Sequence, residues 1–332
     1  MSIKDKISKI KFIKTKIKII LIIILIITNV LTIIFYLYKT NPKTLRELKN
    51  PYPMIDFSRS FISQDNFLTT INPLRERVRD MVKEFGEDKV SIYIEYINTG
   101  ANISINPYLY IWPASLTKMP LALAVMKKVE KGEWKMTNEL VLMKGDANMM
   151  SGVKDNPLSE YPIGTRFTIE KLIEELIINS DNTAYYILLR NLHQDDLSEV
   201  IRSLGMEALF TKEGKISAKE YSRILRALYS ASFLNRENSQ KILSLMSEAK
   251  FNEFLSSGLE EGVIFSHKYG EDDLLNVYSD SGIVYLENRP YIISVMIQGE
   301  KEQYYKIEKE KASVFMKELS REVYEYFLKA HN

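Results

Sequence analysis

The chain has 332 residues, of which 45% are hydrophobic and 27% charged, and its formal net charge is +2. This composition is typical of one large globular domain or two small ones and excludes an intrinsically disordered protein. The absence of cysteine excludes disulfides, thiolate metal sites, a cysteine nucleophile and a lipid-modified cysteine anchor.

The N-terminal segment is first basic and then apolar. Its lysines account for the basic excess of the chain, so the remainder has no surplus that would indicate nucleic-acid binding. Residues 17–38 form an almost unbroken apolar run, long enough to cross a bilayer as a helix. By the positive-inside rule, we expect residues 1–16 to be a cytoplasmic tail, residues 17–38 a single-pass membrane anchor, and the rest of the chain extracytoplasmic. A cleaved signal peptide is the alternative, although no small-x-small cleavage site follows the run.

Residues 39–66 are polar and contain Pro42, Pro51 and Pro53 without sustained periodicity. This pattern predicts a stalk or linker, with a partly ordered N-terminal arm as the equal alternative. Residues 67–332 then form the expected folded domain.

Hydrophobic periodicity predicts the elements of this domain. A helix is expected over residues 72–85, where Asn72 and Pro73 mark its start, followed by strands at 90–97 and 103–105. A helix at 121–129 follows, then loops over 136–166, and then further helices at 169–177, from 183, and at about 197–204, 218–230 and 239–248. Strands return at 263–269, 276–286 and 291–298, before a final helix from about 308. The ends are therefore α/β and the middle is helical, which predicts an antiparallel sheet flanked by terminal helices, with an inserted all-helical lobe.

Ser115 and Lys118 are spaced so that a helix would place them on one face, one turn apart, where the lysine could act as a base for the serine. The pattern S-x-x-K is short, and it also occurs at Ser8, Ser151 and Ser247. Ser8 is expected to be cytoplasmic, Ser151 to lie in a loop and Ser247 to lie near a helix end. The context therefore favours Ser115.

Two further motifs follow Ser115-Leu-Thr-Lys118 in the chain: Ser180-Asp-Asn182 between two predicted helices, and Lys268-Tyr-Gly270 on a predicted strand. A second K-x-G, at Lys212, lies in a predicted loop. In this order the three motifs resemble those of the penicillin-recognising serine hydrolases, and most closely the class A β-lactamase group, over roughly residues 72–328.

The resemblance implies a β-lactamase or transpeptidase-like fold and a role for each matching residue. Ser115 would form an acyl-enzyme, Lys118 would take its proton, and Ser180 would pass a proton to the leaving nitrogen. The remaining residues would bind substrate: Asn182 through its amide, Lys268 and Gly270 at the carboxylate strand, Tyr269 where the family usually has threonine or serine, and Glu271 through an oxyanion-hole N–H shared with Ser115.

One family feature has no match. Class A β-lactamases carry an E-x-x-L-N loop whose glutamate activates the deacylating water, and here only Glu207 and Glu213 lie in the right interval, in a different local sequence. Deacylation is therefore expected to be slow.

The leading hypothesis is a membrane-anchored hydrolase of β-lactams, with antibiotic resistance as its consequence. The alternatives are a D-alanyl-D-alanine carboxypeptidase or another cell-wall amidase or esterase acting on peptidoglycan-derived substrates, and a non-catalytic surface scaffold. No cofactor or metal is expected, because the three histidines are scattered; His267 is interpreted as a packing residue and Asp181 as a helix cap.

Overall fold

The computed structural model describes residues 3–40, 71–148 and 156–329. Contacts divide the chain into two units, Met1–Pro51 and Tyr52–Asn332. The described part of the first unit is the helix α1 (Ile3–Thr40), in which the stretch Lys16–Phe35 has a mean hydropathy of 2.9 and is long and apolar enough to span a membrane. The predicted linker at 39–66 falls almost entirely outside the described residues.

The second unit is built on a five-stranded antiparallel sheet with the strand order β2-β1-β7-β6-β5. Its strands are β1 (Val90–Tyr96), β2 (Ala101–Ile105), β5 (Phe265–Asp272), β6 (Val277–Val284) and β7 (Tyr291–Gln298). Strands from both ends of the unit meet in the middle of this sheet, where Ile92 of β1 lies opposite Val295 of β7. The fold predicted from the sequence, an α/β architecture with an antiparallel sheet made from both ends, is confirmed.

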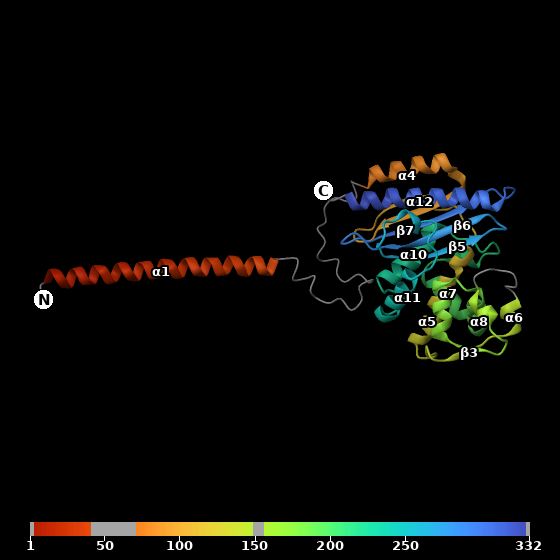
Figure 1. Ribbon diagram of the computed structural model, residues 1–332, viewed down its shortest axis with the longest axis horizontal. Helices are drawn as coiled ribbons and strands as arrows, with labels where there is room; N and C mark the ends of the chain where they lie inside the picture. The colour runs from red at the N-terminus through yellow and green to blue at the C-terminus, as the bar shows by residue number, and fades with distance from the viewer. Residues whose placement is uncertain (1–2, 41–70, 149–155, 330–332) are drawn as a thin grey trace. The chain divides into compact units, whose positions relative to one another are not determined.

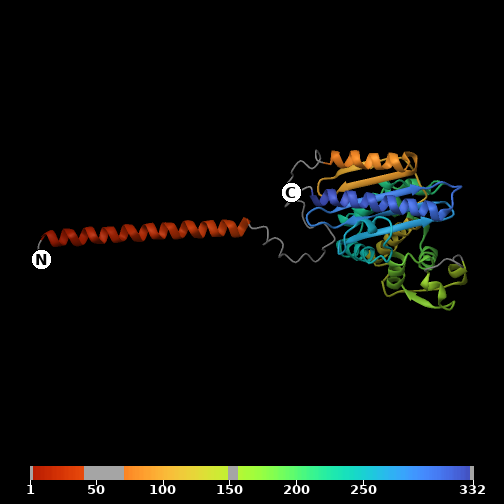
Figure 2. The ribbon, with the colours of Figure 1, turned by 45° about the horizontal axis from the view of Figure 1, so that its top comes forward.

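Two helices cover one face of the sheet, α4 (Asn72–Phe85) and α12 (Tyr305–Lys329) (Figures 1 and 2). Their apolar residues pack on alternate strand residues such as Ile92, Ile293 and Val295, all fully buried. Burial of this continuous apolar stripe is what holds both helices in place.

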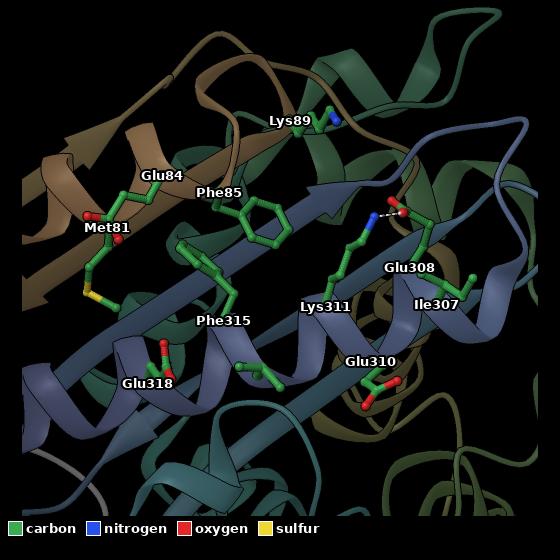
Figure 3. Close-up of a pocket in the computed structure, with 11 residues that line it drawn as sticks. Met81, Glu84, Phe85, Lys89, Ile307, Glu308, Glu310, Lys311, Phe315 and Glu318 are labelled. Atoms are coloured by element: carbon green, nitrogen blue, oxygen red, sulfur yellow. Dashed lines mark hydrogen bonds and ion pairs between the residues drawn. The ribbon is translucent and has the colours of Figure 1, made fainter.

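A cavity of about 580 Å³ lies between α4 and α12, beside the paired rings of Phe85 and Phe315 (Figure 3). It opens among the charged side chains of Glu84, Lys311 and Glu318 and is on the helix-covered face of the sheet.

The opposite face carries the helical lobe (Figure 1). Its helices are α5 (Lys118–Glu130), α7 (Ile169–Ile178), α8 (Asn182–Asn191), α9 (Gln194–Ser203), α10 (Ala218–Tyr229) and α11 (Arg236–Ser247). Central α5 is buried along most of its length, which explains its nearly all-apolar sequence from Met119 to Met126. Thr168, Asp181, Ser217 and Asn235 cap the N-termini of α7, α8, α10 and α11 by accepting backbone N–H groups.

The region expected to be loops, residues 136–166, contains several short elements instead. These are β3 (Glu139–Val141), α6 (Lys144–Asn148) and the 3₁₀ turn η4 (Pro157–Glu160), and β3 pairs with β4 (Arg166–Thr168). Each is five residues or fewer, too short to show a period in the sequence. The remaining 3₁₀ turns are η2 (Glu87–Lys89), η3 (Ala114–Thr117), η5 (Glu207–Phe210) and η6 (Ser256–Gly258).

Candidate active site

Ser115 lies in the turn that leads into α5. The spacing of Ser115 and Lys118 was interpreted as helical, but Ser115 belongs to the 3₁₀ turn η3, and α5 begins at Lys118. The preceding residue, Ala114, has a left-handed backbone with φ +48°, a conformation that costs about 1–2 kcal/mol for a residue with a side chain. Such strain is characteristic of functional turns, where the surrounding structure holds it in place.

Lys118 is buried, with 2% of its surface exposed, and its Nζ lies at the centre of a dense hydrogen-bond network. Nζ is 2.9 Å from Ser115 Oγ, 3.0 Å from Ser180 Oγ, 2.6 Å from the Ser180 carbonyl and 2.6 Å from Asn182 Oδ1. Burial lowers the pKa of Lys118 to about 7, against a smaller opposite effect of the Asp181 carboxylate.

The four oxygens around Lys118 Nζ are placed to accept its N–H groups, and the neutral amine can still serve the closest two. A neutral amine has two N–H donors and one lone pair. The two oxygens that can only accept, the Ser180 carbonyl and Asn182 Oδ1, are the closest and take both donors. The lone pair is then left for a hydroxyl proton, and the hydroxyl of Ser115 is in reach. Burial is what favours this neutral form, and the contacts leave it able to act as a general base toward Ser115.

Ser180 lies at the corner between α7 and α8, also with a left-handed backbone, at φ +55°. This conformation turns its hydroxyl toward both lysines, so that Oγ is 3.0 Å from Lys118 Nζ and 2.8 Å from Lys268 Nζ. The next residue, Asp181, is fully buried and accepts the backbone N–H groups of Ala184 (2.7 Å) and Leu158 (3.1 Å). It therefore holds the corner, and burial raises the pKa of its carboxyl group.

Asn156 is a positioning residue that the sequence did not reveal. Its side-chain oxygen accepts the backbone N–H of Asn182 at 2.7 Å and fixes the start of α8. The Asn156-Pro157 dipeptide marks a turn, but no local pattern indicates that this turn meets a residue 26 positions later.

Lys268 enters the site from β5, one of the two edge strands of the sheet. Only 1% of its surface is exposed, and Nζ donates to Ser180 Oγ and to the Tyr269 carbonyl, 3.3 Å away. Burial, and next the nearby charge of Lys118, lower the pKa of Lys268 well below its ordinary value. The amines of Lys118 and Lys268 thus both contact the one hydroxyl of Ser180.

Gly270 allows η3 to pack directly on β5. A Cβ at this position would lie 2.7 Å from the Pro113 carbonyl oxygen and 3.1 Å from the Ser115 nitrogen, distances that require the turn to shift. The backbone of η3 around Ser115 is therefore in direct contact with the backbone of β5, with no space for a side chain between them. Because β5 is an edge strand, one row of its backbone groups faces away from β6, toward this turn.

The alternating side chains of β5 explain why only some motif residues face the serine. Lys268 and Gly270 point toward the helical lobe, whereas His267 and Glu271 point toward the α12 face. Tyr269 leaves the strand on the same side as His267, but the centroid of its ring lies 4.5 Å from Lys268 Nζ. Glu271 pairs with Lys309 of α12 at 2.8 Å, so its backbone, not its carboxylate, is adjacent to Ser115. His267 stacks on Phe265 and its Nδ1 is 2.9 Å from buried Asp280, a partner that the sequence did not indicate.

The remaining candidates are not part of this cluster. Glu207 and Glu213 are exposed, and Glu213 pairs with Lys215 at 3.1 Å. Among the described residues, the hydrogen-bond partners of the Lys118 amine are serine and asparagine groups, and no carboxylate is one of them. Ser247 ends α11 and donates to Ser244, whereas Ser151 and His331 lie outside the described residues. Across the described ranges no three acidic or histidine side chains are grouped as a metal site would require.

The chain resembles known proteins over most of this unit. A family model described as "Beta-lactamase enzyme family" matches residues 73–327. The β-lactamase VEB-1 of Pseudomonas aeruginosa is 28% identical over 104 residues, which are 31% of this chain and 33% of VEB-1. The match therefore spans about a third of the length of this curated relative.

Solved structures match more of the chain. A mutant of PBP-A, in an acyl-enzyme complex with penicillin G, is 19% identical with a TM-score of 0.68, covering 78% of this chain and 97% of that one. The TLA-3 extended-spectrum β-lactamase is 22% identical with a TM-score of 0.67, covering 78% and 99%. At these identities the likeness establishes a shared fold.

Proposed function

The chain belongs to the β-lactamase enzyme family, and on that premise we propose that it is a serine hydrolase that forms an acyl-enzyme at Ser115 and acts on β-lactams. The observation that carries the proposal is the buried amine of Lys118, which lies 2.9 Å from the hydroxyl of Ser115 and whose pKa burial lowers to about 7. A surface scaffold would not require a buried lysine in this environment.

Acylation follows from the contacts of this cluster. Lys118 Nζ takes the proton of Ser115 as Oγ attacks the carbonyl carbon of the substrate. The backbone N–H groups of Ser115 and Glu271, brought together by Gly270, stabilise the resulting oxyanion. As the C–N bond breaks, Ser180 donates its proton to the leaving nitrogen and recovers one from Lys118, 3.0 Å away. Lys118 is then neutral again, and Ser115 carries the acyl group.

Deacylation has weaker support in the geometry. A water molecule must attack the acyl-enzyme, and among the described residues the groups that hydrogen-bond to Lys118 Nζ are amide, carbonyl and hydroxyl groups, none of them a carboxylate that could activate it. We therefore propose that deacylation is slow. Slow deacylation favours a second candidate function, that of a penicillin-binding D-alanyl-D-alanine peptidase or another cell-wall amidase or esterase. Lys268 and the edge of β5 would bind the substrate in either case, with Asn182 contacting its amide.

One experiment tests the acyl-enzyme. The purified protein is incubated with a fluorescent penicillin and with a chromogenic cephalosporin, beside Ser115→Ala and, as a matched control, Ser247→Ala, which removes a serine of another S-x-x-K pattern. We expect one equivalent of label on the wild type and on Ser247→Ala, and none on Ser115→Ala. Turnover after the first equivalent measures deacylation and separates a lactamase from a peptidase. Equal labelling of Ser115→Ala would contradict the proposal.

We also propose that α1 anchors the enzyme in a membrane, with residues 1–16 cytoplasmic and residues 67–332 forming the extracytoplasmic domain. The support is the apolar stretch Lys16–Phe35, whose described side chains are exposed. Mass spectrometry of the mature protein distinguishes an anchor from a cleaved signal peptide. Protease protection of the domain in sealed vesicles would contradict the orientation if the vesicles are right side out.

A further inference from the structure

Tyr269 occupies the position where the related enzymes usually have threonine or serine, and its ring has two specific neighbours. It stacks on Phe251, with ring centroids 3.7 Å apart and an interplanar angle of 9°. The Nζ of Lys268 is 4.5 Å from the centroid of the same ring. Because Phe251 covers one face at stacking distance, the amine lies over the other face. The ring is therefore held between an aromatic side chain and the lysine of the site.

This arrangement encloses the amine of Lys268. The side chain is 1% exposed, and Nζ contacts Ser180 Oγ, the Tyr269 carbonyl and the Tyr269 ring. A carboxylate that forms an ion pair with Lys268 must displace one of these neighbours. Ser180 cannot be displaced without loss of its proposed role in proton transfer, so the ring is the group in the way.

The charges around β5 also oppose an entering anion. Asp280 is buried on the neighbouring strand, and both Asp280 and Glu271 act electrostatically on Lys268. Glu271 shares Lys309 with Glu253, at 2.8 and 3.6 Å. Three carboxylates, those of Asp280, Glu271 and Glu253, thus already lie near Lys268 and Lys309. The electrostatic attraction left for a substrate carboxylate is therefore small.

We propose that Tyr269 is a specificity-determining residue that uncouples substrate selection from the carboxylate, so that neutral acyl donors acylate Ser115 as readily as their free acids. The substrate class then includes esters and amides without a negative charge next to the scissile bond. This inference rests on the proposed acyl transfer at Ser115 and adds the substrate class to it.

A matched pair of substrates tests it: a chromogenic cephalosporin and the methyl ester of its ring carboxyl group. The second-order acylation rate constants of the two are measured for the wild type, Tyr269→Thr and Tyr269→Phe, and only the acid-to-ester ratio within each protein is compared. We expect a wild-type ratio within about threefold of one and a rise of at least about tenfold in Tyr269→Thr, where a hydroxyl replaces the ring. Tyr269→Phe keeps the ring and should keep the wild-type ratio.

Three outcomes overturn the inference. A wild-type acid-to-ester ratio above about ten shows that the enzyme recognises the carboxylate. This result overturns the inference even if Tyr269→Thr does not fold. An unchanged ratio in Tyr269→Thr shows that the ring does not select. A shift in Tyr269→Phe assigns the effect to the phenol hydroxyl instead. If neither substrate acylates Ser115 of the wild-type protein, the result is a different one, because it contradicts the proposed function itself.

Discussion

Acylation of Ser115 should depend on pH through the protonation of Lys118. Burial lowers the pKa of this amine to about 7, so near neutrality it changes from a proton acceptor to an ammonium that cannot take the serine proton. With that pKa, about 90% of the lysine is neutral at pH 8 and about 10% at pH 6, and the acylation rate constant should fall about tenfold between them.

The assay is the second-order labelling rate of the full-length protein by a fluorescent penicillin, measured from pH 5 to 9. Lys118→Arg serves as the control, because a guanidinium stays protonated over this range and should lose about 100-fold or more of the rate at every pH. Asn182→Ala assigns the transition: loss of an acceptor 2.6 Å from Nζ disfavours the ammonium, so the midpoint should move to lower pH.

A labelling rate that is equal at pH 6 and pH 8, or higher at pH 6, would refute the assignment of Lys118 as the base. An acid limb that persists with the same midpoint in Asn182→Ala would refute the assignment of the titration to this amine.

Three further predictions concern stability and packing. Lys118 has a pKa of about 7 in the folded protein, against an ordinary value of 10.5. Between these two pH values the unfolded chain binds more protons than the folded one, so the free energy of unfolding rises with pH. Urea unfolding should show this rise as about 2 kcal/mol between pH 7 and 9, and Lys118→Met should lack it. A wild type and a variant with parallel pH profiles would contradict this. Asp181→Ala removes two buried acceptor contacts and should lower the unfolding free energy by about 2–4 kcal/mol, whereas Asp181→Asn should lose less than half of that; equal losses in urea titrations would argue against the cap. Gly270→Ala places a methyl group against the turn of Ser115 and should slow acylation by about 100-fold with an unchanged far-ultraviolet circular dichroism spectrum, and a rate within threefold of the wild type would show that the turn can shift freely.

The sheet could be predicted because its strands have strong local patterns. Residues 90–97 alternate and residues 291–298 form a largely apolar run of strand length, and the structure places strands at Val90–Tyr96 and Tyr291–Gln298. That strands from both ends share one antiparallel sheet was predicted from their position on either side of a helical insert. The direct pairing of these two strands was not predicted. The strand order beyond that pairing does not follow from periodicity.

The geometry around Ser115 was predicted in part. The spacing of Ser115 and Lys118 places them together in an α-helix and equally in a 3₁₀ turn, where residues three apart eclipse each other. Ser115 and Lys118 are therefore close together in either kind of turn. Asn156 and Phe251 were missed because each meets the site through the tertiary fold, and neither belongs to a motif.

The position of β7 in the sheet has a consequence for biosynthesis. β7 pairs with β1 on one side and β6 on the other, yet it is translated about 200 residues after β1. Until residue 298 has emerged, the nascent polypeptide holds an apolar hairpin whose inner edge has no partner. Assembly of the sheet must then be largely post-translational. A premature stop codon before β7 would leave an aggregation-prone fragment with unpaired strand edges, a substrate for proteases and chaperones and not a partly active enzyme.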